Sequence, residues 1–130
     1  MDDLLEWLRA QLAEDERIAR AADPELSNIF SRVEVFDSEM AADERHVMLH
    51  NPARVLREID AKRRVLARHH AAPVPPGSEQ MAEFPYCAAH AYTQPDGVIV
   101  YPVELKNCPE RRLLALPYAD RPGYREEWRP

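Results

Sequence analysis

A chain of 130 residues can bury one modest hydrophobic core, so the sequence predicts a single domain over residues 1–130. Its first residues carry neither a basic start nor a continuous apolar run, which argues against a signal peptide or a membrane span and predicts a cytoplasmic protein. The formal net charge of −6 disfavours sequence-independent binding to nucleic-acid phosphates, and two cysteines are too few for a disulfide scaffold.

The first helix is expected to begin at Asp2 or Asp3, either of which can cap it. Apolar residues recur along it at intervals of three and four, as on one buried helix face: Leu5, Leu8, Leu12 and Ala19. We expect Pro24 to end this helix, because proline disfavours helical geometry in the residue before it and cannot donate to the helical ladder. Residues 29–36 alternate imperfectly between apolar and polar, which predicts a short strand.

Two further helices are expected in the first half of the chain. Residues 37–38 offer caps for one that runs to about Leu49. Asn51 as the cap, with Pro52 at the first helical position, predicts another that runs to about His70, because a missing N–H is no loss there. The expected buried stripe of that helix consists of Val55, Ile59 and Leu66.

The second half is expected to begin with a loop and to continue as a hairpin. The proline-rich segment 72–80 predicts the loop. Segments 86–92 and 98–103 are rich in aromatic and β-branched residues and flank a Gln-Pro-Asp-Gly turn signature, which predicts an antiparallel pair. A short helix is expected over residues 109–116, with proline at its first position and proline after its end, and the aromatic tail 118–130 predicts an ordered strap.

Four side chains in and just before this second half have the chemistry of metal ligands: His69, Cys87, His90 and Cys108. Cys87 and His90 form a Cys-x-x-His pair just before the hairpin, and Cys108 lies at the start of the following helix, where the helix dipole favours the thiolate. The fourth ligand is expected from His69 or His70. His70 is the reserve, since it points about 100° away from His69 on a helix.

Spacing alone leaves other interpretations of these residues open. The two cysteines could be small buried hydrophobic residues, with His90 at the surface. They could also form a disulfide between Cys87 and Cys108.

A family resemblance shifts the balance toward a metal. The residues that carry it are 1–4, 14–16, 18–22, 50–58, 61–64 and 108–109, then Leu-Ala-Leu-Pro-Tyr-Ala-Asp at 114–120 after Leu113, then Pro122 and Tyr-Arg-Glu-Glu-Trp at 124–128. They resemble a family of short uncharacterised proteins, a domain of unknown function, found in actinobacteria and their bacteriophages.

The resemblance implies a Cys-x-x-Cys where this chain has Cys87 and His90, a later Cys-Pro that matches Cys108, and a histidine that matches His69. The departure at His90 is one that zinc tolerates, since imidazole replaces thiolate in many four-ligand sites. The resemblance implies no activity, substrate or partner. We therefore predict a structural Zn²⁺ ion held by His69, Cys87, His90 and Cys108.

His46 and His50 form a second constellation, four positions apart on one face of a predicted helix. Such a pair can bind a metal or serve acid–base chemistry, but the chain has no His-Glu-x-x-His motif and no glycine-rich phosphate loop. We favour a local role at the helix junction. The basic helix 54–68 resembles a phosphate-binding patch, yet no aromatic residues interleave with its arginines, which favours a solvated face.

These elements predict an α+β fold that is mostly α. Residues 1–70 are expected to form a three-helix part, and residues 71–130 a zinc-held β-hairpin and short helix with the C-terminal strap. For function we expect a non-enzymatic protein-interaction or regulatory module with an unidentified protein partner and no membrane. The first alternative is a nucleic-acid-binding regulator that uses helix 54–68, and the second is a metal-dependent enzyme.

Overall fold

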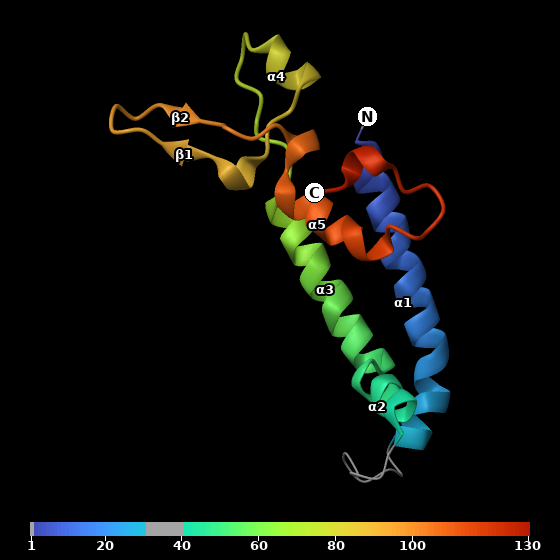
Figure 1. Ribbon diagram of the computed structural model, residues 1–130. Coiled ribbons are helices and arrows are strands. Elements are labelled where there is room, and N and C mark those ends of the chain that lie inside the picture. The colour runs from blue at the N-terminus through green and yellow to red at the C-terminus, as the bar shows by residue number, and fades with distance from the viewer. Residues whose placement is uncertain (1, 31–40) are drawn as a thin grey trace. The chain divides into compact units, whose positions relative to one another are not determined.

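The computed structural model describes residues 2–30 and 41–130 (Figure 1). This part of the chain is mostly helical, with one small antiparallel sheet, as expected for a mostly α member of the α+β class. Its helices are α1 (Asp3–Phe30), α2 (Ala42–Leu49), α3 (Pro52–Arg68), α4 (Glu79–Glu83) and α5 (Pro109–Ala115). The strands are β1 (Tyr92–Thr93) and β2 (Ile99–Val100). None of the described helices is both long and apolar enough to span a lipid bilayer.

Contacts divide the chain into two compact units. One contains residues 10–61, and the other contains residues 1–9 and 62–130. Helices α1 and α3 therefore each contribute residues to both units. The unit that contains all four predicted ligands also takes in the first turns of α1 and the end of α3, stretches that the sequence placed in the helical part.

Helix α1 begins where the sequence predicts, and Asp2 is its cap. The Leu5 N–H donates to Asp2 Oδ1 at 3.2 Å, which satisfies one of the amide groups that every helix start leaves without an intrahelical partner. The expected end at Pro24 is wrong, because α1 continues to Phe30. Proline removes one donor from the ladder, but residues 21–22 and 25–26 around it, Ala-Ala and Glu-Leu, have high helix propensity.

The strand expected over residues 29–36 is wrong for its first two positions, which belong to α1, and its remainder lies outside the described residues. Positions 37–40 of the second expected helix also lie outside the described residues. The described part of that helix, α2, ends at Leu49 as predicted. The start of α3 is confirmed, since the Arg54 N–H donates to the Asn51 side chain at 2.9 Å.

Among the residues of unit 10–61 whose burial is described, the buried apolar ones include Leu12, Ala19 and Ile59. Two of them, Leu12 and Ala19, come from the predicted face of the first helix, and Ile59 comes from the predicted stripe of α3. Helix α2 has no buried residue.

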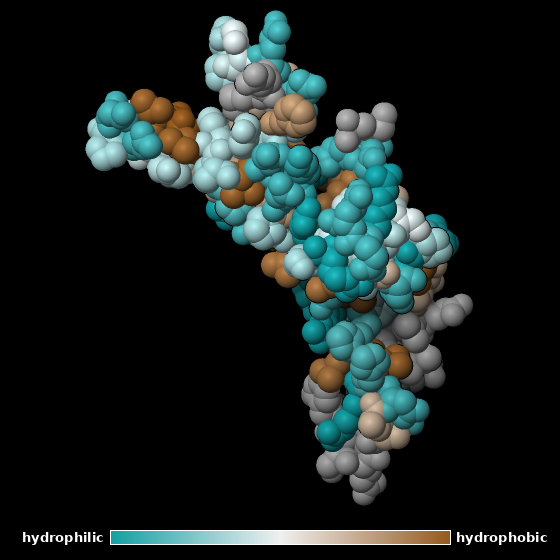
Figure 2. All heavy atoms as spheres, turned by 45° about the horizontal axis from the view of Figure 1, so that its top comes forward, coloured by the Kyte–Doolittle hydropathy of each residue, from teal (hydrophilic) through white to brown (hydrophobic). Residues whose placement is uncertain are grey.

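In the other unit, the hairpin is shorter than expected. Tyr92 pairs with Val100 and Thr93 with Ile99, and the turn between the strands uses Gly97 at φ +86°, a left-handed conformation that glycine adopts without steric cost. Pro85, directly before the first expected strand, and Pro102, inside the second, have no N–H to extend the ladder. Figure 1 shows the hairpin projecting from the rest of this unit, and Figure 2 shows hydrophobic atoms gathered on it.

The proline-rich segment 72–80 is irregular as expected until α4 begins at Glu79. Helix α5 begins at Pro109 as predicted, and a 3₁₀ turn over Leu116–Tyr118 follows it and takes in Pro117.

The C-terminal tail packs against the start of α1. Trp128 is 7% exposed, and its ring centroid lies 5.4 Å from that of Trp7. Tyr124 joins them edge-on, 5.7 Å from Trp7, and Trp7 Nε1 donates to the Pro122 carbonyl at 3.1 Å. Aromatic rings at such distances and tilts attract one another and bury large apolar areas. The tail therefore forms an ordered part of its unit.

Candidate metal centre

Three separate segments bring the candidate ligands together. The first is the end of α3, where the His69 N–H still donates to the carbonyls of Val65 and Leu66, at 3.2 and 3.1 Å. This last helical turn fixes the backbone of His69 directly after Arg68. His70 follows on an exposed position and has no place in the cluster.

The second segment supplies the Cys-x-x-His pair. Cys87 is held by its N–H, which donates to the Val103 carbonyl at 2.8 Å. Ala88–His90 form a 3₁₀ turn, in which side chains three residues apart eclipse one another. The turn therefore places His90 on the same side as Cys87.

The third segment supplies Cys108, which caps α5 directly before Pro109. Its sulfur lies in an apolar cluster with Cys87 and Leu105, against which Val103 packs. Both cysteines are fully buried, and both thiols are free. The disulfide that the sequence left open is therefore absent from the described structure.

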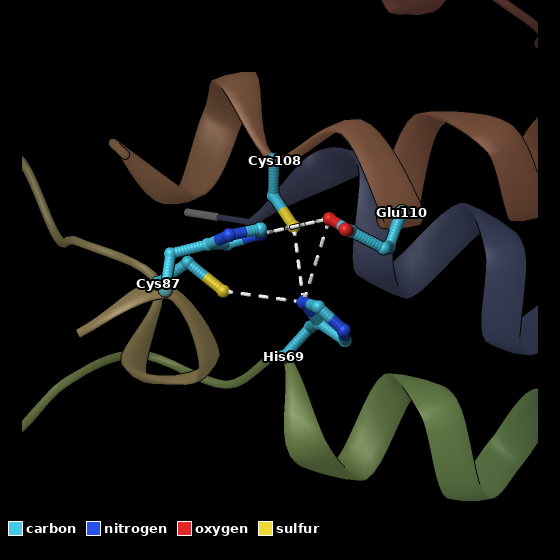
Figure 3. A network of polar contacts seen from close by, with 5 residues as sticks. His69, Cys87, Cys108 and Glu110 are labelled. Atoms are coloured by element: carbon cyan, nitrogen blue, oxygen red, sulfur yellow. Dashed lines mark hydrogen bonds and ion pairs between the residues drawn. The ribbon is translucent and has the colours of Figure 1, made fainter. Parts of the chain in front are cut away.

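The donor atoms of His69, Cys87, His90 and Cys108 all lie within 4.8 Å of one another. His69 Nδ1 lies 3.5 Å from Cys87 Sγ and 3.3 Å from Cys108 Sγ, and His90 Nε2 lies 3.7 Å from Cys108 Sγ (Figure 3). In a tetrahedron with ordinary zinc–sulfur and zinc–nitrogen bonds, a sulfur–nitrogen edge is roughly 3.5 Å long. The spacing is thus compatible with a four-ligand metal site.

Burial shifts the pKa of two side chains of this cluster, Cys108 and His69. Burial raises the pKa of the Cys108 thiol to about 11, although the Arg111 N–H at the start of α5 acts in the opposite direction. The expectation that the helix start would favour the thiolate is therefore wrong for the metal-free cluster, because desolvation outweighs the amide. Burial also lowers the pKa of His69, which favours the neutral imidazole that metals bind.

The family model of DUF6221, described as a family of unknown function, matches residues 1–130. The chain belongs to DUF6221. The resemblance seen in the sequence is confirmed to that extent. No curated protein and no solved structure shows significant similarity to the chain. Membership of DUF6221 brings no activity with it, so the chemistry of the cluster carries the functional argument.

Sequence reasoning missed one residue of the cluster, Glu110. Its Oε2 atom lies 2.8 Å from His90 Nε2, 3.4 Å from Cys108 Sγ and 3.7 Å from His69 Nδ1. Partial burial acts to raise the pKa of Glu110, but hydrogen bonds from its own N–H, His90 and Cys108 outweigh it and lower the pKa. The sequence signal that could have identified Glu110 is its position two residues after Cys108, in the first turn of α5.

The second histidine pair forms no comparable site. The rings of His46 and His50 stack with centroids 4.5 Å apart on exposed α2, and the His50 N–H donates to the His46 carbonyl at the end of that helix. Within the described ranges, neither belongs to a group of three or more metal-binding side chains. A local role at the helix junction stays a prediction.

Proposed function

We propose that the chain is a small zinc-stabilised protein in which one Zn²⁺ ion is bound by His69, Cys87, His90 and Cys108 and has a structural role. The observation that carries this proposal is the convergence of two fully buried cysteines and two histidines from three segments. Two soft thiolates with two imidazoles are a donor set typical of zinc.

A structural role follows from the number of protein ligands. Structural zinc sites are held by protein side chains alone, most often four of them, whereas catalytic zinc sites have three protein ligands and an open position for a reactive water. The second expected function, a metal-dependent enzyme, is therefore less well supported.

The metal would also stabilise a part of the chain that has little regular structure. Around the cluster, single backbone hydrogen bonds link the segments: Ala72 N–H to Tyr86 at 2.7 Å, Ala88 N–H to His70 at 2.9 Å and Leu105 N–H to Pro85 at 2.7 Å. A hairpin of two-residue strands is marginal by itself. Metal-binding free energy would become folding free energy for this unit.

For the stabilised unit we propose a role as a protein-interaction or regulatory module. The hairpin presents Tyr92, Val98 and Ile99, each more than half exposed at 52%, 53% and 55%. Exposed apolar side chains on a projecting element favour contact with a protein partner. The nucleic-acid alternative has less support, because Arg54 at the start of the basic helix pairs with Glu58 at 2.9 Å in a chain of net charge −6.

Metal analysis tests the zinc site. Protein purified without added metal is expected to contain about one zinc per chain, as a four-ligand site implies, and to lose thermal stability on treatment with a chelator. A fully folded, metal-free protein would contradict the proposal.

Affinity purification from cells of the source organism tests the interaction role. Wild-type protein is expected to enrich a protein partner that Ile99→Ser, with its zinc content unchanged, does not enrich. Strongly salt-dependent binding of DNA or RNA in its place would favour the nucleic-acid alternative.

A further inference from the structure

We propose that Glu110 is a fifth ligand of the bound metal, through its Oε2 atom, a proposal that rests on the zinc site proposed above. The candidate centre would then have two sulfur, two nitrogen and one carboxylate oxygen donor.

The main observation for a fifth ligand is the position of the Glu110 Oε2 atom. Glu110 Oε2 lies within 3.7 Å of three donor atoms of the cluster, at distances of 2.8, 3.4 and 3.7 Å. The distances to Cys108 and His69 fall within the 3.3 to 3.7 Å that separate the histidine nitrogens from the cysteine sulfurs, and the distance to His90 is shorter. Figure 3 shows the Glu110 side chain pointing into the group formed by Cys108 and His69.

The contacts of Glu110 differ from those of a carboxylate that supports a metal ligand by a hydrogen bond without binding the metal itself. A carboxylate that supports a metal-bound histidine usually accepts from the ring nitrogen that does not bind the metal. Here Oε2 contacts His90 Nε2, which is also the nitrogen that faces the sulfur of Cys108. A nitrogen that binds a metal has no proton to donate, so the metal ion would abolish this hydrogen bond.

The hydrogen bond from Cys108 Sγ to Glu110 would be abolished in the same way, because a ligating thiol has lost its proton. The carboxylate would then lie beside a thiolate, two like charges at close range. A bound cation removes that repulsion if it takes the carboxylate as a ligand. Zinc accepts a fifth donor, since its filled d shell imposes no fixed geometry.

Exposure agrees with a ligand on the solvent side of the centre. The Glu110 side chain is 39% exposed, against 13% for His69 and 23% for His90. Both cysteines are fully buried, so Glu110 lies on the exposed side of the cluster.

X-ray absorption at the zinc edge tests the proposal on the full, zinc-loaded chain and on Glu110→Gln, which keeps the size of the side chain but is a poor ligand. Wild type is expected to show two sulfur and three nitrogen or oxygen neighbours, and the variant one fewer light atom. Zinc affinity measured against a competing chelator is expected to fall about tenfold in Glu110→Gln.

Cobalt in place of zinc gives a second readout, because visible absorption of Co²⁺ is stronger in a tetrahedral than in a five-ligand site. Glu110→Gln is expected to absorb more strongly than wild type. Glu126→Gln is the matched control, since its carboxylate pairs with Arg129 and contacts no ligand of the cluster. It is expected to behave as wild type in both measurements.

Two results would overturn the inference, and they can be told apart. Identical coordination in wild type and Glu110→Gln, with zinc bound to both, would exclude Glu110 as a ligand and leave the four-ligand site intact. A wild-type chain that binds no stoichiometric zinc would overturn the proposed site and the fifth ligand with it.

Discussion

Arg111 Nη2 donates to Asp2 Oδ2 at 2.5 Å, and the Arg111 side chain is only 2% exposed. The carboxylate that compensates this buried charge comes from the cap of α1, so Asp2 both caps a helix and pairs with a buried guanidinium. Removing one member of a buried ion pair leaves the other charge without compensation, which costs far more than the loss of a surface pair.

Asp2→Asn is expected to lower the free energy of unfolding by roughly 2–3 kcal/mol, somewhat below the loss for a fully buried pair because Asp2 is 34% exposed. Asparagine caps helices about as well as aspartate, so the loss reports on the ion pair. Asp3→Asn is the control. Its partner Arg125 is 52% exposed, and its loss is expected to stay below about 1 kcal/mol. Equal losses in urea unfolding would contradict this prediction.

Substitution of each of the adjacent residues His69 and His70 in turn tests which of them binds the proposed metal. His69→Gln is expected to lower zinc affinity about tenfold or more, because the Nδ1 atom of His69 lies within 3.5 Å of both cysteine sulfurs. His70→Gln changes an exposed neighbour outside the cluster and is expected to keep about one zinc per chain, as the four-ligand site implies. The zinc affinities of the two purified variants, measured against a competing chelator, decide between the two histidines. An affinity of His69→Gln equal to that of wild type would exclude the proposed ligand set.

Loss of a thiolate is expected to loosen one unit of the chain. In Cys108→Ser, the amides of Ala72, Ala88 and Leu105, whose hydrogen bonds link the segments around the cluster, are expected to exchange roughly tenfold faster or more. Amides within residues 10–61 are expected to keep their protection, because they belong to the other compact unit. Hydrogen exchange with mass spectrometry measures both, and an even loss along the whole chain would count against a local role for the metal.

Gly123 offers a test of the contact between the tail and α1. It has φ +87°, and a Cβ atom there would lie 2.8 Å from Trp7 Nε1. Gly97 has nearly the same φ, +86°, but a Cβ atom would meet nothing within 4 Å. Both alanine variants incur the cost of a left-handed residue, about 1–2 kcal/mol, and Gly123→Ala is expected to lose a further 1–3 kcal/mol or so through overpacking.

Thermal or urea unfolding of Gly123→Ala and Gly97→Ala measures the difference between their losses in free energy of unfolding. Equal losses would mean that Trp7 moves aside without cost. Trp fluorescence is expected to change only in Gly123→Ala, because its Cβ atom would press on the indole.

Local signals in the sequence predicted part of the fold correctly. The starts of α3 and α5 were predictable because Asn51-Pro52 and Cys108-Pro109 combine a residue before the helix with a proline in the first turn, where its missing N–H costs no hydrogen bond. The convergence of His69, Cys87, His90 and Cys108 was also predictable from the sequence, since a Cys-x-x-His pair converges locally and His69 directly follows the helix that precedes it. That these side chains bind a metal stays a prediction.

Other features depend on contacts that no local pattern encodes. The length of α1 past Pro24 depends on how the helix-forming residues on both sides offset one lost hydrogen bond. The strands were overestimated because aromatic and β-branched content predicts strand without regard to partners, and Ala88–His90 form a 3₁₀ turn instead. The pairing of Arg111 with Asp2 spans 109 positions, so no sequence window contains both residues.

The contact between Trp7 and the Pro122 carbonyl, 115 positions apart, also sets an order of events during synthesis. A ribosome adds about 5–20 residues per second, so roughly 6–23 s separate the two residues as they are made. Residues 10–61 can form contacts with one another in that interval. The partners of Trp7 and Asp2, which are Pro122 and Arg111, have not yet been synthesised at that point. Cys108 completes the candidate ligand set only 14 positions before Pro122 is made, so capture of the proposed metal would come close in time to the contact between the tail and α1.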